Sequence, residues 1–399
     1  MPPLHPLLKK GLWAIPILSA SYITFLLILT IPTVQRLALY AHPIHTGYWD
    51  DINVPEYWGF APGQVTPFTI STPDGETLYG WHILPLDVYA AHADVLAANP
   101  PRTPEPFNST FAAKLLSSDP SSRVIVNFHG NAGHVAQSHR PPTYKLLTAL
   151  PHTHLLSLSY RGFAHSTGFP SEKGLITDAT TLLSATLSLV PANRILLLGQ
   201  SLGTAVAAAA ALHFDDPAAA AKYLDSPAPP HPPPPVRFAS VILVASFPSL
   251  PTLLLTYRAG GLVPFLAPLA RWPGLQALAA KGIHEVWPTG LRVAALVAGM
   301  AARGEGGTPV RVLHARDDAD IGCGRSGEVL DAVVEGAREQ GLVVVDERGE
   351  EGGEVFVGGV RVKLDIVKFG GEYACAGCGM WLMRQGIIGL WLMRRLCWR

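Results

Sequence analysis

Runs of basic residues are absent from this sequence, and that absence bears on the class of partner it can bind. The 399 residues include 30 Lys and Arg against 30 Asp and Glu, so the formal net charge is zero at pH 7. Proteins that bind nucleic acids gather positive charge on one face, because contacts to phosphates supply much of their affinity. No basic stripe interleaved with aromatic residues occurs here, so we expect no nucleic-acid partner.

Cysteine is scarce and confined to the end of the chain. All four cysteines lie at or beyond Cys323, which leaves no framework for a disulfide-stabilised fold. Cys375 and Cys378 have the Cys-x-x-Cys spacing of half a zinc site, but the chain offers no second pair of ligands. We therefore expect neither a metal site nor a cofactor.

Charged residues are missing from one long segment near the N-terminus. Gly11 to Gln35 contains 25 residues without a charge. As one helix it would extend roughly 37 Å, more than the roughly 30 Å of a bilayer core. A cleaved signal peptide is the alternative, but the apolar run is longer than usual and no Ala-x-Ala site follows it. We expect a retained transmembrane anchor at residues 11–35.

The charges around this segment predict its orientation. Lys9 and Lys10 precede it and only Arg36 follows closely, so the positive-inside rule places residues 1–10 in the cytosol and the bulk across the membrane. The Asn-Ser-Thr sequon at Asn108 has meaning only in the secretory pathway. We expect a single-pass type II protein of the endoplasmic reticulum, with the lipid bilayer as a partner, a lumenal catalytic domain and a glycan on Asn108.

Short apolar runs alternate with helical patterns along the rest of the chain. Residues 65–70 and 77–84 alternate as strands do and flank a Pro-Asp-Gly-Glu turn, which predicts a hairpin. Six later runs are apolar throughout, as strands buried on both faces of a sheet are. They span residues 123–128, 154–159, 194–198, 240–245, 310–314 and 360–369. This alternation predicts an α/β fold, with a mostly parallel sheet covered by helices on both faces.

Two segments interrupt the alternation. Residues 227–235 are rich in proline and predict an extended linker, although such a segment is also typical of an SH3 or WW ligand. Residues 248–307 show no strand pattern, and prolines break their apolar, helix-forming stretches. This pattern indicates a helical cap over an active site or, alternatively, a second face of packed helices.

The pentapeptide Gly199-Gln200-Ser201-Leu202-Gly203 lies between one of these apolar runs and an alanine-rich stretch. A nucleophile elbow needs a strand, a turn so tight that glycine must flank the serine, and then a helix. Both flanks are present here. Ser201 is therefore the candidate nucleophile rather than part of a chance Gly/Ser turn.

A serine nucleophile needs an oxyanion hole and an acid that orients its base. The loop His129-Gly130-Asn131-Ala132-Gly133 follows an earlier strand, so we assign the hole to the backbone N–H groups of Leu202 and Asn131 and give His129 a bracing role. Two adjacent carboxylates, Asp317 and Asp318, follow the run at 310–314. We favour Asp318 as the acid.

These motifs, in this order, resemble a known family. Together with Tyr160-Arg161-Gly162-Phe163 they are similar to those of membrane-anchored α/β-hydrolase-domain serine hydrolases, the monoacylglycerol and lysophosphatidylserine lipases of endoplasmic-reticulum membranes. The match covers about residues 60–371. The resemblance implies the α/β-hydrolase fold, a small lipid ester as substrate, Ser201 as nucleophile and Asp318 as acid, with Arg161 bracing neighbouring loops.

The triad histidine that the resemblance implies is missing. It should follow Asp318, but the last of the 15 histidines is His314, and where the family pattern has Gly-Gly-His this chain has Gly-Gly followed by Glu372. Residues 372–399 differ in composition from everything before them. We interpret them as an aberrant tail, for which translation of a retained intron is one hypothesis and true loss of the base is the other.

The sequence therefore predicts a lipid-ester hydrolase that works through an acyl-enzyme. One alternative is an inactive pseudo-hydrolase that acts as a binding or scaffold protein. The other is a protein acyl-thioesterase, which would have its catalytic face in the cytosol.

Overall fold

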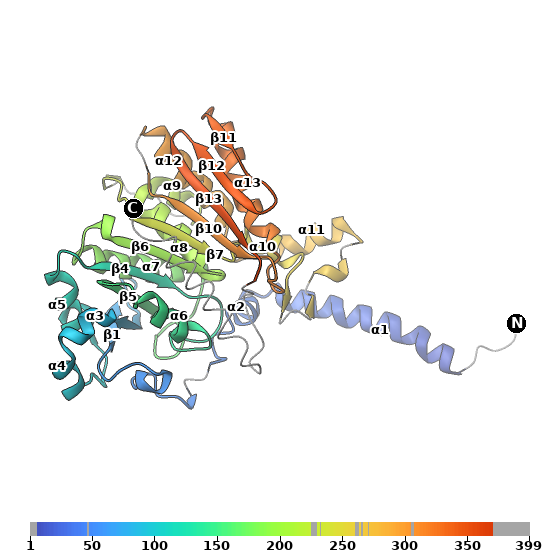
Figure 1. The fold of residues 1–399 in the computed structure, drawn as a ribbon. Helices are drawn as coiled ribbons and strands as arrows, with labels where there is room; N and C mark the ends of the chain where they lie inside the picture. The colour runs from blue at the N-terminus through green and yellow to red at the C-terminus, as the bar shows by residue number, and fades with distance from the viewer. Residues whose placement is uncertain are drawn as a thin grey trace, which may run out of the picture.

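The computed structural model describes residues 6–45, 48–224, 230–231, 233–259, 263–264, 266–269, 271–304 and 307–369. An eleven-stranded sheet forms the centre of the body (Figure 1). The Cys375–Cys378 pair, the rest of the predicted tail and part of the proline-rich segment lie outside the described residues.

Six neighbouring strands form the parallel centre of the sheet, in the order β5-β4-β6-β7-β10-β13. Their bounds are Arg123–Phe128 for β4, Thr153–Ser159 for β5, Ile195–Gln200 for β6, Ser240–Val244 for β7, Val310–Ala315 for β10 and Val360–Val367 for β13. Each strand coincides with one of the six apolar runs, so the predicted parallel sheet is confirmed.

Antiparallel strands extend the sheet at both edges. β1 (Val65–Ser71) and β2 (Thr77–Ile83) form the predicted hairpin, and β2 pairs with β5. The short β3 (Glu105–Pro106) lies beside β1. At the other edge, β11 (Val344–Asp346) and β12 (Gly352–Val357) pair antiparallel before β13.

Helices cover both faces of the sheet. One face carries α7 (Glu172–Leu187), α8 (Leu202–Asp215), α12 (Thr289–Ala302) and α13 (Gly324–Glu339). The other face carries α6 (Arg140–Leu147), which contributes Tyr144 and Leu147 to a second hydrophobic cluster. The shorter helices are α3 (Leu86–Ala91), α4 (Ala93–Ala98), α5 (Phe111–Ser118), α9 (Pro217–Lys222), α10 (Leu250–Leu254) and α11 (Pro273–Lys281).

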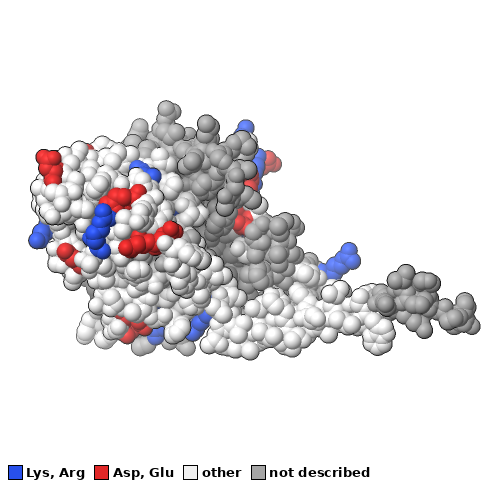
Figure 2. Space-filling model, turned by 90° about the horizontal axis from the view of Figure 1, so that it is seen from below, with Lys and Arg blue, Asp and Glu red and all other residues white. Residues whose placement is uncertain are grey.

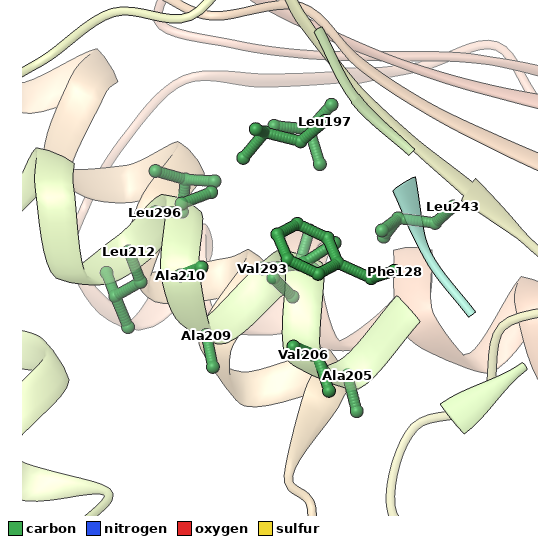
Figure 3. Packing of buried hydrophobic residues seen from close by; sticks show 14 of the residues in the cluster. Phe128, Leu197, Ala205, Val206, Ala209, Ala210, Leu212, Leu243, Val293 and Leu296 are labelled. Carbon is green, nitrogen blue, oxygen red and sulfur yellow. The ribbon is translucent and has the colours of Figure 1, made fainter. Parts of the chain in front are cut away.

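The alanine-rich α8 is the central helix of the core. Every residue from Leu202 to Leu212 is buried, and the helix packs against α7, α12 and the sheet. Figure 3 shows Ala205, Ala209 and Ala210 of α8 in the same buried cluster as Leu197 and Phe128. Alanine side chains allow such close approach of a helix to its neighbours, and burial supplies the helix with stability that its isolated form would lack.

The predicted span at residues 11–35 is not one helix. α1 (Pro6–Leu29) ends before Pro32, and α2 (Pro32–Tyr40) begins there. Proline at 32 lacks an amide hydrogen and holds Ile31 in an extended conformation, which breaks the helix. Among the described residues no single helix is long and apolar enough to cross a membrane, although Trp13–Leu29 and Pro32–Tyr40, bent by 95°, pass that test as a pair.

The predicted hydrolase domain starts at residue 60, but residues before this position already belong to the folded body. Tyr40 and Ile52 are fully buried in the two hydrophobic clusters. The buried carboxylate of Glu285 binds α2: it accepts hydrogen bonds from Arg36 Nε and Tyr40 Oη, both at 2.6 Å, and another from the backbone N–H of Glu172. α2 is therefore part of the folded body, whereas α1 projects from it (Figure 1).

We expect Glu285→Gln to lower the free energy of unfolding by about 1–3 kcal/mol, because charge-assisted hydrogen bonds to a buried carboxylate are lost. Urea unfolding in detergent would measure the change. The matched control is Glu328→Gln, which removes the half-exposed partner of Arg325 and should change stability by less than about 1 kcal/mol. Equal losses in both variants would contradict the assignment of Glu285 as the residue that docks α2.

The predicted cap at residues 248–307 is only partly separate from the body. α12 packs against α8 and α13 and buries most of its residues, because its apolar side chains complete the core. α10, the two-stranded β8 (Arg258–Ala259) and β9 (Val263–Pro264), and α11 precede it. The structure thus narrows the segment that can act as a cap to about 248–288.

Two buried histidines predict a pH dependence of stability. His82 Nε2 and His154 Nδ1 share a hydrogen bond of 2.9 Å between β2 and β5, and burial lowers the pKa of His154 to about 4 and that of His82 well below its ordinary 6.5. Below pH 6.5 the unfolded chain therefore binds protons on these two imidazoles, whereas the folded chain keeps them neutral.

The stability contributed by this exclusion is fully present above pH 6.5 and is lost as the pH falls from 6.5 towards 4. Urea midpoints measured across that range should fall less steeply in His154→Gln than in the parent chain. The control is His231→Gln, at an exposed position, and it should keep the parent slope.

Candidate active site

The ends of the parallel strands bring the predicted site residues to one edge of the sheet. β4 and β6 are aligned with Phe128 opposite Gly199, β6 and β7 with Gln200 opposite Val244, and β10 and β13 with Ala315 opposite Val367. The residues that follow these strands therefore emerge together, as ligand-binding residues do in open α/β sheets. Ser201 follows β6 and Asp318 follows β10 by three residues.

Ser201 occupies a strained turn between β6 and α8. Its backbone has φ 52° and ψ −121°, a conformation that residues with a side chain rarely adopt. The Ser201 N–H donates to the carbonyl of Val244 at 2.9 Å, which fixes the turn against the neighbouring strand. Leu202 is the first residue of α8, so its N–H has no acceptor within the helix.

The glycines on both sides of Ser201 have no space for a side chain. A Cβ at Gly199 would lie 2.3 Å from the carbonyl oxygen of Gly203, and one at Gly203 would lie 1.9 Å from that of Phe128. Each distance is far below van der Waals contact. The pentapeptide thus has the strand, turn and helix that a nucleophile elbow requires.

The loop that holds Asn131 is organised by a residue that the sequence analysis missed. The buried guanidinium of Arg140 donates to four carbonyl oxygens, those of Gly130, Asn131, Ala132 and His134, at 2.6–3.2 Å. No motif marks Arg140 in the sequence, because its partners are backbone atoms. Carbonyls that converge on one cation leave the amides of the loop directed elsewhere, which is what an oxyanion hole needs.

We expect Arg140→Met to lower kcat by roughly 10²-fold, about the effect of losing one oxyanion donor, because the carbonyls it gathers would be released. Arg140→Lys should recover only part of this, since an ammonium cannot reach four acceptors in a planar fork. Hydrolysis of a soluble ester would be measured, together with urea unfolding. An unchanged kcat in a folded variant would contradict this role.

His129 and His139 are both buried beside this loop. The ring of His129 packs against Tyr160 with 4.3 Å between centroids, and its Nδ1 lies 2.7 Å from the carbonyl of Gly130. Burial lowers its pKa well below 6.5, and its contacts agree with a bracing role, which stays a prediction. His139 Nε2 donates to the side-chain oxygen of Gln200 at 2.9 Å and connects the loop to the elbow.

Asp318 and Asp317 occupy different environments. Asp318 is buried, and its Oδ1 accepts the N–H groups of Asp320 at 3.0 Å and Ile321 at 2.8 Å. Its Oδ2 is buried and accepts no hydrogen bond from the described residues. Asp317 is exposed. Asp318 is thus the carboxylate held in a fixed orientation at this edge of the sheet.

His314, the last histidine of the sequence, lies beneath Asp318. Its Nε2 is 3.2 Å from Asp318 Oδ2 but donates to the carbonyl of Ile321 at 2.8 Å, and its Nδ1 is hydrogen-bonded to Ser326 Oγ at 2.6 Å. Both ring nitrogens are therefore engaged inside the body. Position 372, where a triad histidine would be expected, lies outside the described residues.

Arg161 braces the loop after β5, as predicted. Its guanidinium binds Asp178 of α7 at 2.7 Å and Asp74 of the β1–β2 turn at 2.6 Å. Burial raises the pKa of Asp178 to about 6, against the lowering effect of Arg161. The sequon residue Asn108 is exposed in a short 3₁₀ helix just before α5.

Comparisons with known proteins agree with this architecture. A family model described as the alpha/beta hydrolase fold matches residues 123–268. The lysophosphatidylserine lipase ABHD12 of Danio rerio is 28% identical over 176 residues, which cover 44% of this chain and 42% of that protein. Protein ABHD12B of Homo sapiens is 46% identical over 88 residues, 22% of this chain and 24% of the relative. The chain thus spans under half the length of these relatives.

Among solved structures, an esterase of Pyrococcus furiosus is similar, with a TM-score of 0.47 and 13% identity over 86% of this chain and 94% of that one. An alpha-beta hydrolase of Vibrio vulnificus has the same TM-score, with 14% identity over 84% and 81%. The strand order, the elbow and the family match all indicate one fold. The chain has the α/β-hydrolase fold, and the curated proteins that it resembles include lysophosphatidylserine lipases.

Proposed function

We propose that this protein is a membrane-anchored serine hydrolase that cleaves small lipid esters, of the monoacylglycerol or lysophospholipid type. The observation that carries the proposal is the elbow: Ser201 has a strained backbone between two glycines that admit no side chain. Such strain persists only where the surrounding structure enforces it, and it presents the hydroxyl at the carboxyl edge of the sheet.

In the proposed reaction, Ser201 Oγ attacks the acyl carbonyl and gives up its proton to a base. The backbone N–H groups of Leu202 and Asn131 stabilise the oxyanion, and collapse of the tetrahedral intermediate releases the alcohol with that proton. Water then hydrolyses the acyl-enzyme. Arg140 positions the loop of Asn131, and Asp318 Oδ2 is the acceptor available to orient a histidine.

This chain has no histidine after Asp318, so the base is the missing part of the mechanism. Without it, Ser201 still has its elbow and its oxyanion donors, which alone support a residual rate over water of about 10³–10⁴-fold. A slow enzyme and a non-catalytic binding protein are therefore the two states to distinguish.

The lipid character of the substrate is supported by the lysophosphatidylserine lipases among the relatives and by the apolar α1, whose described side chains are mostly exposed. An exposed apolar helix of this length is favourable in a bilayer rather than in water. We propose the same type II orientation in the endoplasmic reticulum as the flanking charges predict, with Asn108 in the lumen.

The test is labelling of the full-length chain in detergent with a fluorophosphonate, followed by mass spectrometry of the labelled peptide. We expect an adduct on Ser201, and slow release of fatty acid from a monoacylglycerol. A folded chain without an adduct on Ser201 would overturn the enzyme proposal in favour of the binding protein. Faster cleavage of an acyl thioester than of the oxygen ester, with no glycan on Asn108, would instead favour the thioesterase.

A further inference from the structure

α11 is a helix that buries none of its side chains in the described part of the chain, although Gln276 Nε2 donates to the carbonyl of Leu266 at 3.3 Å. Its nine residues, Pro273–Lys281, include none that is buried. By contrast α5, with eight residues, buries Ala112, Ala113 and Leu116. A helix of nine residues is marginal in water unless its apolar face packs against something. The described residues around α11 therefore leave its apolar face uncovered.

The exposed face of α11 is apolar. Trp272, which precedes the helix, is 56% exposed, Leu275 is 50% exposed and Leu278 is 65% exposed. They follow one another at intervals of three residues, which places them along one side of the helix. The charges are basic and lie at the ends, Arg271 before the helix and Lys281 in its last turn.

α11 ends against the junction of α1 and α2. The carbonyl of Gly282 accepts a hydrogen bond from Gln35 Nε2 at 2.9 Å, and His284 Nε2 donates to the carbonyl of Thr30 at 3.0 Å. The exposed Leu27 and Ile28 lie on the turn of α1 just before this contact. Figure 1 shows α11 on the same side of the body from which α1 projects.

The apolar surface is thus continuous from α1 to α11. From Trp13 to Leu29, α1 carries no charged side chain, and Figure 2 shows this segment as a white projection. α2 is bent by 95° from α1 and is bound to the body through Glu285. If α1 stands along the bilayer normal, α2 lies parallel to the membrane surface, and α11 lies beside the end of α1 that is nearest the body (Figure 1).

We propose that α11 is an interfacial helix that inserts Trp272, Leu275 and Leu278 into the surface of the bilayer that α1 enters. This inference rests on the proposed membrane insertion of α1. Tryptophan at the interface, leucines in the acyl boundary and basic residues towards the headgroups are the arrangement that such helices use. Because residues 248–288 leave the sheet at the carboxyl end of β7, the edge that carries Ser201 then faces the membrane.

The test places an environment-sensitive fluorophore on α11 in the full-length chain. The four native cysteines are replaced by serine, and Leu278→Cys is labelled with nitrobenzoxadiazole. The matched control is Val95→Cys on α4, a position 63% exposed. Both chains are incorporated into phosphatidylcholine vesicles with and without a spin-labelled lipid, and flotation is measured in the same samples.

We expect the probe at 278 to shift to shorter wavelength and to lose most of its emission to the spin-labelled lipid, while the probe at 95 does neither. Leu275→Glu in the same chain should reduce the quenching several-fold. Flotation with an unquenched probe at 278, or with equal quenching at both positions, overturns the role of α11 alone. A chain that does not float overturns the anchor and the role of α11 together, and none of these results depends on hydrolysis by Ser201.

Discussion

Ser201→Ala is expected to abolish labelling by a fluorophosphonate completely, yet to change the slow hydrolysis by this chain little. The reason is that catalytic residues that act as a unit are not additive. Once one member of a triad is missing, removal of a second costs little, whereas removal of the serine from a complete triad costs about 10⁶-fold in kcat. The labelling reaction differs because it forms a bond to Ser201 Oγ itself.

A second substitution, which supplies the missing histidine, would reveal how much Ser201 contributes to kcat. Glu372→His restores the Gly-Gly-His pattern after β13, and the Arg316 N–H bonded to the Val367 carbonyl at 2.7 Å holds the end of β13 beside the strand that leads to Asp318. We expect this variant to raise kcat by about 10²-fold or more. Ser201→Ala in that background should then remove nearly all activity.

The role of Asp318 is tested by Asp318→Asn. In the Glu372→His background it should lose most of the gain, because an amide cannot stabilise the imidazolium, whereas Asp317→Asn at the exposed neighbour should keep it. All variants are compared by kcat on a soluble ester and by urea unfolding. A gain in Glu372→His that survives Asp318→Asn would contradict Asp318 as the acid.

Much of the fold could be predicted because its signals are local. The six parallel strands coincide with apolar runs, since a strand buried on both faces needs apolar residues throughout. β11 and β12 gave no such signal: β11 has exposed side chains, and glycines and charged residues lie between the two strands. The elbow was predictable because its two glycines are required by sterics within a few residues.

The rest depends on side-chain contacts that leave no pattern in the sequence. Arg140 acts through the carbonyls of a loop six to ten residues away, and Glu285 holds Arg36 and Tyr40 from the other end of the chain. Neither Arg140 nor Glu285 is marked by a sequence pattern, because many kinds of donor can form a hydrogen bond to a backbone carbonyl or to a carboxylate. The predicted 11–35 helix differs in extent from α1 for a local reason: Pro32 can begin a helix as well as lie near the end of one.

Gly203→Ala should prevent the chain from folding to its native state, or lower its stability by more than about 4 kcal/mol. The new Cβ would lie 1.9 Å from the carbonyl oxygen of Phe128 and 2.8 Å from that of His129. Neither obstacle is a flexible side chain, so α8 would have to move away from β4. Every residue at the start of α8 is buried, and overpacking of a core is one of the few mechanisms that cause losses above about 4 kcal/mol.

The matched control is Gly327→Ala in α13, where the added Cβ meets nothing within 4 Å. There alanine should stabilise the helix by up to about 1 kcal/mol, because glycine is the poorer helix former. Urea midpoints and labelling of Ser201 would be measured in both variants. A Gly203→Ala chain with the parent midpoint would mean that α8 does not approach β4 as closely as the elbow requires, and the assignment of Ser201 as nucleophile would lose its geometric basis.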